Sequence, residues 1–225
     1  HIFCALKDLA TDSDELSCIP LNTEKYISFN WKKYRFLDSF NFLSSSFDTL
    51  FGNLDDCDKI NTRNACRDES DFKYLKRKGE FPYEWFDDIM KLEETELPPH
   101  SEWFSTLRGE NVSAESYSWA KEVWKHFDCK TFRDYHDIYL RIDTLGLADI
   151  FEKFRKITMR DYGLDPNYYF TLPGLAWDSA LKMTEVELEL FTDPDKHLFI
   201  ERGIRGGVSV QSHRYSKANN PLCED

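Results

Sequence analysis

Tyr139 and Asp143, in the segment YLRID, are the residues whose types and spacing most directly suggest chemistry. They stand four residues apart, so on a helix their side chains lie one above the other. A carboxylate on a rigid helix can hold a divalent cation, and a neighbouring tyrosine can orient a metal-activated water, which together suit phosphodiester hydrolysis. The spacing is also common by chance, so a solvated Asp143 beside a half-buried, packed Tyr139 remains an open alternative.

A second candidate is the arm RGIRGGVSVQSHRYSK, residues 202–217. It contains no acidic residue, although 41 of the 225 residues of the chain are acidic. Arg205 and Arg214 can bind phosphate, and the pair Gly206 and Gly207 allows a partner to approach the backbone closely. The arm therefore predicts a nucleic-acid contact, with a turn carrying scattered surface charge as the alternative.

Two further stretches carry weaker signals. The segment LDSFNFL (37–43) sets Ser39 and Phe40 in an alternation of polar and large apolar residues. Such interleaved aromatic rings suit stacking on single-stranded nucleic acid, and core packing explains them equally well. The segment KYLKRK (73–78) is a basic cluster that suits either phosphate binding or the solvated face of a helix.

A long helix over residues 131–161 must position Tyr139 and Asp143. Gly163 and Pro166 mark the end of this helix, because a glycine favours the C-terminal cap and a proline cannot continue the helix. The apolar residues of the segment recur at helical spacing and predict one buried stripe: Ile138, Ile142, Leu145, Phe151 and Phe154. Tyr139 and Asp143 lie at the edge of that stripe.

The rest of the chain predicts an α/β fold in which helices predominate. Further helices are expected at residues 44–54, 112–127, 172–183 and 193–203, and a hairpin at residues 25–39. Residues 55–70 are mostly charged and polar, and they predict no element.

The composition fits one large folded domain, or one domain with an arm. Hydrophobic residues make up 41% of the chain, enough for a sizeable core, and the net charge is −12. Such an acidic balance disfavours nucleic-acid binding unless the basic residues are segregated. The six cysteines include no CxxC pair, which argues against a structural zinc site and favours reduced thiols in an intracellular protein. The sequence contains no signal peptide and no apolar run that would span a bilayer.

Several long segments, taken in order, resemble the protein-primed family B DNA polymerases of organelles, viruses and DNA transposons. They are DSFNFLSSSFDTL, KGEFPYEWFDD with EETELPP, DYHDIYLRIDTLGLADIFEKFR, DPNYYFTLPGLAWDSALKMTEVELELFTD and HLFIERGIRGGVSVQSHRYSKANN. The resemblance implies the C-terminal part of an RNase H-like 3′–5′ exonuclease domain with an incomplete sheet over residues 1–200. Residues 201–225 would then be an extended linker arm toward the polymerase palm.

The resemblance also implies roles for individual residues. YLRID is similar to the Y-x3-D exonuclease motif, which makes Asp143 a metal ligand and Tyr139 the residue that orients the attacking water. Ser39 and Phe40 stand at a motif that contacts the primer strand. Residues 204–207 are similar to the Tyr-x-Gly-Gly loop that touches the template, with isoleucine in place of the tyrosine. The basic exonuclease motif has no clear match here, and Lys76 is its only candidate.

The parent enzyme implied by the resemblance is a DNA-directed DNA polymerase with proofreading. It would act on a DNA primer-template with dNTPs and Mg²⁺ or Mn²⁺, with a terminal protein as a possible primer and no membrane partner, in the nucleus, an organelle or a viral factory. The chain opens with His1 and ends at PLCED without the other exonuclease motifs or the palm, so an internal fragment, inactive by itself, is expected. The alternative is a non-catalytic DNA-binding or interaction domain from a decayed or domesticated transposon.

Overall fold

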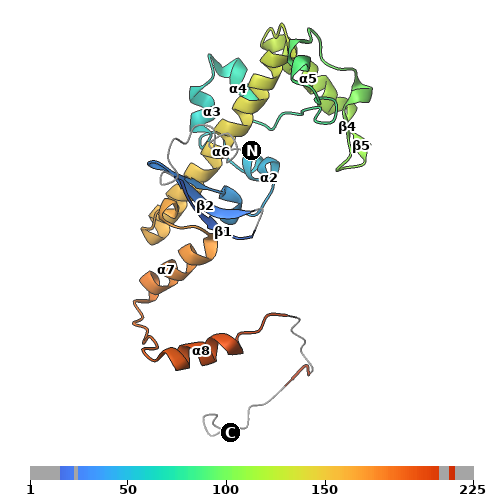
Figure 1. The fold of residues 1–225 in the computed structure, drawn as a ribbon. Coiled ribbons are helices and arrows are strands. Elements are labelled where there is room, and N and C mark those ends of the chain that lie inside the picture. Colours follow the sequence, from blue (N-terminus) through green and yellow to red (C-terminus); the bar gives the residue numbers. More distant parts are fainter. Residues whose placement is uncertain (1–15, 23–24, 208–212, 216–225) are drawn as a thin grey trace. The chain divides into compact units, whose positions relative to one another are not determined.

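The computed structural model describes residues 16–22, 25–207 and 213–215 (Figure 1). The chain divides into two compact units, residues 1–184 and residues 185–225. The expected division at residues 200 and 201 falls further along the chain, inside the second unit. The α/β, helix-rich class predicted from the sequence is confirmed, while the finer expectation of an RNase H-like domain stays a prediction.

Helix α6 (Phe132–Tyr162) is the element on which the first unit is built (Figure 1). Thr131 and Asp134 form a capping box at its start, and Gly163 ends it in the left-handed conformation with φ of 63°. These bounds confirm the helix predicted at residues 131–161. The buried residues Ile138 and Ile142 belong to its predicted apolar stripe.

The N-terminal half of α6 packs against an aromatic core. The surrounding elements are η3 (Ile89–Glu93), η4 (His100–Glu102), the hairpin β4 (Phe104–Ser105) and β5 (Glu110–Asn111), and α5 (Ala114–His126). Phe132 and Trp103 are almost wholly buried there, and Trp103 donates a hydrogen bond from Nε1 to the carbonyl of Pro98. The helix predicted at residues 112–127 is confirmed by α5, whose N-cap is Ser113.

Helix α2 (Phe47–Gly52) crosses α6 at a glycine. Ser46 caps α2 by accepting a hydrogen bond from the backbone of Thr49, which confirms the short helix predicted within residues 44–54. A Cβ atom on Gly146 would lie 2.7 Å from Cζ of Phe47, so only glycine allows this approach.

Helix α3 (Ile60–Asn64) and the first residues of α4 (Glu69–Leu75) occupy a stretch for which the sequence predicted no element. A buried carboxylate of α6, that of Asp149, holds the start of α3. Its two oxygens accept hydrogen bonds of 2.7–3.0 Å from the backbone and side-chain donors of Asn61 and Thr62. Helix α3 has no side-chain cap of its own, so α6 satisfies the backbone N–H groups of Asn61 and Thr62.

Helix α4 is anchored to α5 by a second buried carboxylate. Asp71 accepts hydrogen bonds from the Arg67 guanidinium and from Nε2 of His126, at 2.8–2.9 Å. The Arg67 hydrogen bonds hold the pKa of Asp71 well below its usual range, so this carboxylate stays charged in the interior.

A three-stranded antiparallel meander lies near the C-terminal part of α6. It comprises β1 (Leu16–Pro20), β2 (Tyr26–Trp31) and β3 (Tyr34–Leu37), in the order β1-β2-β3. The tight turn between β2 and β3 includes Lys32 with φ of 53°, which confirms the hairpin predicted at residues 25–39. The Arg35 guanidinium of β3 donates to the carbonyl of Tyr169, just after η5 (Pro166–Tyr168), and so ties the meander to the chain that follows α6.

Helices α7 (Leu172–Thr184) and α8 (Pro194–Gly203) confirm the predictions for residues 172–183 and 193–203. Helix α7 completes the first unit, and α8 belongs to the second. Among the described residues, no helix has both the length and the apolar character needed to cross a bilayer. Cys18, Cys57, Cys66 and Cys129, the cysteines that the structure describes, are free thiols.

Replacing Asp149 with alanine tests the contact between α3 and α6. We expect Asp149→Ala to lower the free energy of unfolding by roughly 3–5 kcal/mol, because several buried donors lose their acceptor at once. Urea denaturation followed by circular dichroism measures the change. Asp137→Ala is the control, because this carboxylate is exposed on the same helix, and equal stability losses in the two variants would contradict the assignment.

Candidate functional site

Tyr139, Asp143 and Gly146 form one column on α6, at positions i, i+4 and i+7. At one end of the column, the chain after α4 packs on Tyr139, since a Cβ atom on Gly79 would lie 3.1 Å from that ring. At the other end, α2 packs on Gly146 through Phe47. Asp143 therefore lies between two covered positions, on the face that the sequence predicted for the pair.

Tyr139 is buried, with 8% of its surface exposed. Its hydroxyl shares a hydrogen bond of 2.7 Å with the hydroxyl of Tyr83, a residue that is itself 63% exposed. Burial, followed by this hydrogen bond, raises the pKa of Tyr139 above its usual value. The phenol stays neutral, and it can donate or accept one further hydrogen bond.

The Asp143 carboxyl is partly buried and incompletely paired. Its Oδ1 atom is shielded from solvent and has no hydrogen-bond partner within the part of the chain that the structure describes. Burial raises the pKa of Asp143, and the Tyr139 hydroxyl and the charge of Lys78 partly offset that effect. A buried acceptor without a donor costs free energy, and such orphans in folded proteins need an explanation such as a bound ion or a ligand.

A pocket of about 170 Å³ opens beside Tyr139. Its polar lining includes Lys78, Tyr83, Glu84, Ser105 and Arg108. The sequence reasoning missed Lys78 and Tyr83 as partners of the candidate pair. The available signal was the basic run KYLKRK followed at once by Gly79, which packs on Tyr139, and by Pro82 three residues later.

The candidate for the basic exonuclease motif, Lys76, does not reach this pocket. Its Nζ atom donates to the Asp56 carboxylate at 2.8 Å, and its ammonium group lies 5.7 Å from the ring centroid of Phe72. Lys78, two residues later, is the cation that acts on Asp143 and lines the pocket with Tyr139.

Ser39 and Phe40 lie on the short turn η2 (Ser39–Asn41). Phe40 is 59% exposed, and the next aromatic residue, Phe42, is buried against Phe151 with ring centroids 5.8 Å apart. Phe151 stands roughly 12 Å along α6 from Asp143, at ~1.5 Å per residue. Among the described residues, no hydrogen bond or ring contact joins Ser39 or Phe40 to the candidate pair.

Arg205, Gly206, Gly207 and Arg214 belong to the second unit and are exposed. Gly207 has φ of 152°, and no atom lies within 4 Å of the place where a Cβ would stand. Arg205 hydrogen-bonds the carbonyls of Arg202 and Ile204. Residues 208–212 and 216–217 of the predicted arm lie outside the described residues.

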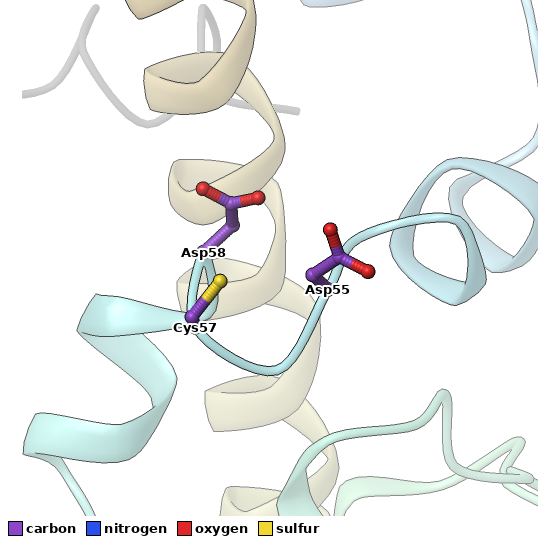
Figure 2. Close-up of side chains that lie close together, drawn as sticks. All are labelled: Asp55, Cys57 and Asp58. Carbon is purple, nitrogen blue, oxygen red and sulfur yellow. The ribbon is translucent and has the colours of Figure 1, made fainter.

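One loop between α2 and α3 groups three side chains that could hold a metal ion (Figure 2). Ligand atoms of Asp55, Cys57 and Asp58 lie within 4.8 Å of one another. Asp58, however, already pairs with Nζ of Lys153 at 2.6 Å. The sequence analysis missed this group because it considered only CxxC cysteine spacing, and not a cysteine and two aspartates in one loop.

The Mg²⁺ or Mn²⁺ ion that the resemblance implies lacks a complete set of ligands in this structure. Within the described ranges, Asp143 is not part of any group of three or more metal-ligating side chains. A two-metal site needs several carboxylates. Within the described residues, the candidate site supplies one carboxylate with an unpaired oxygen, that of Asp143.

Replacing Asp143 with asparagine tests the state of this carboxyl. The folded chain binds the Asp143 proton more tightly than the unfolded chain, so ionisation above about pH 4 lowers the free energy of unfolding. We expect Asp143→Asn to melt at a higher temperature than the wild type at pH 7, and the difference to vanish near pH 3. The control is Asp137→Asn, and an Asp143→Asn variant that is less stable at pH 7 would contradict the orphan carboxyl.

Comparisons of this chain with protein-family models, with curated proteins and with solved structures find no significant match.

Proposed function

We propose that this chain is part of a DNA-directed DNA polymerase of family B, in the protein-primed branch, and carries part of its 3′–5′ exonuclease. The parent protein would copy viral, organellar or transposon DNA from a primer-template with dNTPs and a divalent cation. The first unit would then be the C-terminal part of the RNase H-like exonuclease domain. The reaction is inferred from the ordered segments quoted above, and the arrangement around Asp143 supports it.

The residues around Asp143 suit binding and cleavage of a phosphodiester. The Lys78 ammonium group can bind a phosphate oxygen beside the carboxylate. The neutral Tyr139 phenol can hold a water in place, since burial and Tyr83 fix its position. Asp143 offers one carboxylate oxygen to a cation, and residues outside the described part of the chain would have to complete that site.

One observation carries the proposal: Oδ1 of Asp143 is buried and unpaired beside Tyr139 and Lys78. A carboxylate whose role is only structural normally finds donors, as Asp149 does on the same helix. Perturbed, partly desolvated carboxyls with a specific cation nearby are typical of functional sites.

The proposal also assigns contacts with the primer and the template to residues outside the candidate site. Ser39 and Phe40 would contact the primer strand, and the exposed ring of Phe40 is available for stacking. Arg205, Gly206, Gly207 and Arg214 would contact the template backbone from the second unit. Both assignments rest on the sequence resemblance together with the exposure of these residues.

A second candidate function is favoured by the incomplete ligand set at Asp143. A non-catalytic DNA-binding or interaction domain, derived from a transposon polymerase, would need the fold and its basic surfaces and no complete metal site. Nuclease activity of the longer protein that contains this chain separates the two candidates.

The decisive measurement is proofreading by a polymerase that contains this chain. We expect Asp143→Ala to slow removal of a mismatched 3′ nucleotide by about 100-fold or more, the scale on which one electrostatic group at a reaction centre acts. Primer extension should continue at close to the wild-type rate. Degradation of a labelled primer without dNTPs, and extension with them, measure the two activities.

Asp137→Ala is the matched control, because it removes an exposed carboxylate from the same helix. Unchanged hydrolysis in Asp143→Ala would reject Asp143 as a catalytic group. A wild-type protein that extends primers and never shortens them would favour the non-catalytic alternative.

A further inference from the structure

The basic run KYLKRK brings cations and rings together on one surface of the first unit. We define the α4–α5 cation surface as Lys73 and Tyr74 of α4, Arg77 just beyond it, and Trp119 of α5. Arg77 Cζ lies 4.5 Å from the centroid of the Trp119 ring, and Lys73 Nζ lies 6.0 Å from it. Lys73 Nζ also lies 5.0 Å from the Tyr74 ring, whose centroid is 5.1 Å from that of Trp119.

Two like charges thus share one indole ring without a neutralising partner. Within the described residues, no ion pair joins Lys73 or Arg77 to any carboxylate, whereas Lys76 from the same run pairs with Asp56. Glu115 and Glu122 lie within one turn of Trp119 along α5, and neither forms an ion pair with the two cations. Like charges held close together repel each other, so an anion placed between them would be stabilised.

The surface continues into the candidate site. Arg77 is followed directly by Lys78, which lines the pocket beside Tyr139. Three cations that form no ion pair among the described residues, Lys73, Arg77 and Lys78, therefore follow one another from the face of α5 to the pocket, where the charge of Lys78 also acts on Asp143. In a chain with a net charge of −12, such segregation points to a polyanionic partner.

We infer that the α4–α5 cation surface binds the phosphate backbone of single-stranded DNA that extends from the pocket at Tyr139. The path of the strand away from the pocket rests on the proposed function. The binding itself rests only on the cations. The two cations cover the indole face, so they present charge rather than a bare ring, and the contact is to phosphates and not to bases. The rings serve to hold the two long side chains in place.

DNA fits this surface better than an acidic peptide does. The cations follow one another along the chain to a pocket where a phosphodiester is proposed to bind. A DNA strand supplies one phosphate anion at every nucleotide. The contact should be independent of base sequence and strongly dependent on salt, because it releases condensed counterions.

The test measures binding of the 225-residue chain to a labelled single-stranded oligonucleotide by fluorescence anisotropy over a salt series. The variant Lys73→Ala/Arg77→Ala removes two phosphate contacts. Its salt slope should fall by about 1.4, since each contact to a single strand contributes ~0.7, and its Kd at about 0.1 M salt should rise roughly 25-fold. Thermal melting confirms folding, which is expected because both side chains are exposed.

The matched control is Lys130→Ala/Arg160→Ala, which removes one lysine and one arginine that are exposed and paired with Asp128 and Asp161. The control should keep a near-wild-type slope. Equal losses in the two double variants would show that only net charge matters and would overturn the inference. So would a wild-type chain that does not bind the oligonucleotide, or polyglutamate that competes as well as DNA at equal charge.

This test fails or succeeds independently of the exonuclease proposal. Oligonucleotide binding by the 225-residue chain depends on the cations and needs no hydrolysis, whereas Asp143→Ala in the polymerase is measured by hydrolysis alone. If that polymerase variant keeps full hydrolysis while Lys73→Ala/Arg77→Ala loses DNA binding, the proposed function fails and the DNA surface stands.

Discussion

The carboxylate of Asp149 attaches helix α3 to α6, the central helix of the first unit. A helix of five residues such as α3 is too short to be stable alone, because nucleation costs more than a single turn returns. Asp149 overcomes this by accepting four hydrogen bonds at the start of α3. Burial of a charge is unfavourable unless its hydrogen bonds are complete, and here the donors come from one fixed turn. Asp71 joins α4 to α5 in the same manner, so two charged anchors supplement the aromatic core.

These anchors explain which parts of the fold could be predicted from the sequence. Helix α6 carries its own signals, namely apolar periodicity, a capping box and a terminal glycine, and its bounds follow from them. Helix α3 has no such local signals. The residue that caps it stands 88 positions away from Asn61 in the sequence, on a different helix, so a window of neighbouring residues cannot reveal it. Residues 55–70 are mostly charged and polar, so their composition alone predicts no helix.

The candidate site likewise contains residues that the sequence predicts and residues that only the fold brings together. The spacing of Tyr139 and Asp143 placed them on one face because both lie on a single helix, whose geometry the spacing fixes. Lys78 and Tyr83 reach them only after the chain leaves α4 and folds back at Gly79, so spacing within the sequence does not encode the contact. Lys76 looks equivalent to Lys78 in the sequence, and only the direction of the chain after Leu75 separates the cation held by Asp56 from the one in the pocket. Among the described residues, Oδ1 of Asp143 is the one carboxylate atom that is buried without a hydrogen-bond partner, and the other such side-chain atoms are Oγ of Ser28 and Nε1 of Trp31. An unsatisfied buried carboxylate is expected where function competes with stability.

The close approach of α2 at Gly146 also governs how α6 can move. The helix advances ~1.5 Å and turns about 100° per residue, so a shift by one residue would bring Leu145 or Leu147 beneath the Phe47 ring. Either side chain is far larger than the Cβ atom that already fails to fit there. The contact at Gly146 therefore fixes both the axial position and the rotation of α6 against α2, and a shift by one residue is blocked. Asp143 lies three residues before Gly146 on the same rigid helix. The contact at Gly146 therefore also fixes the position of Asp143 relative to the segment at residues 78–83, which packs on Tyr139.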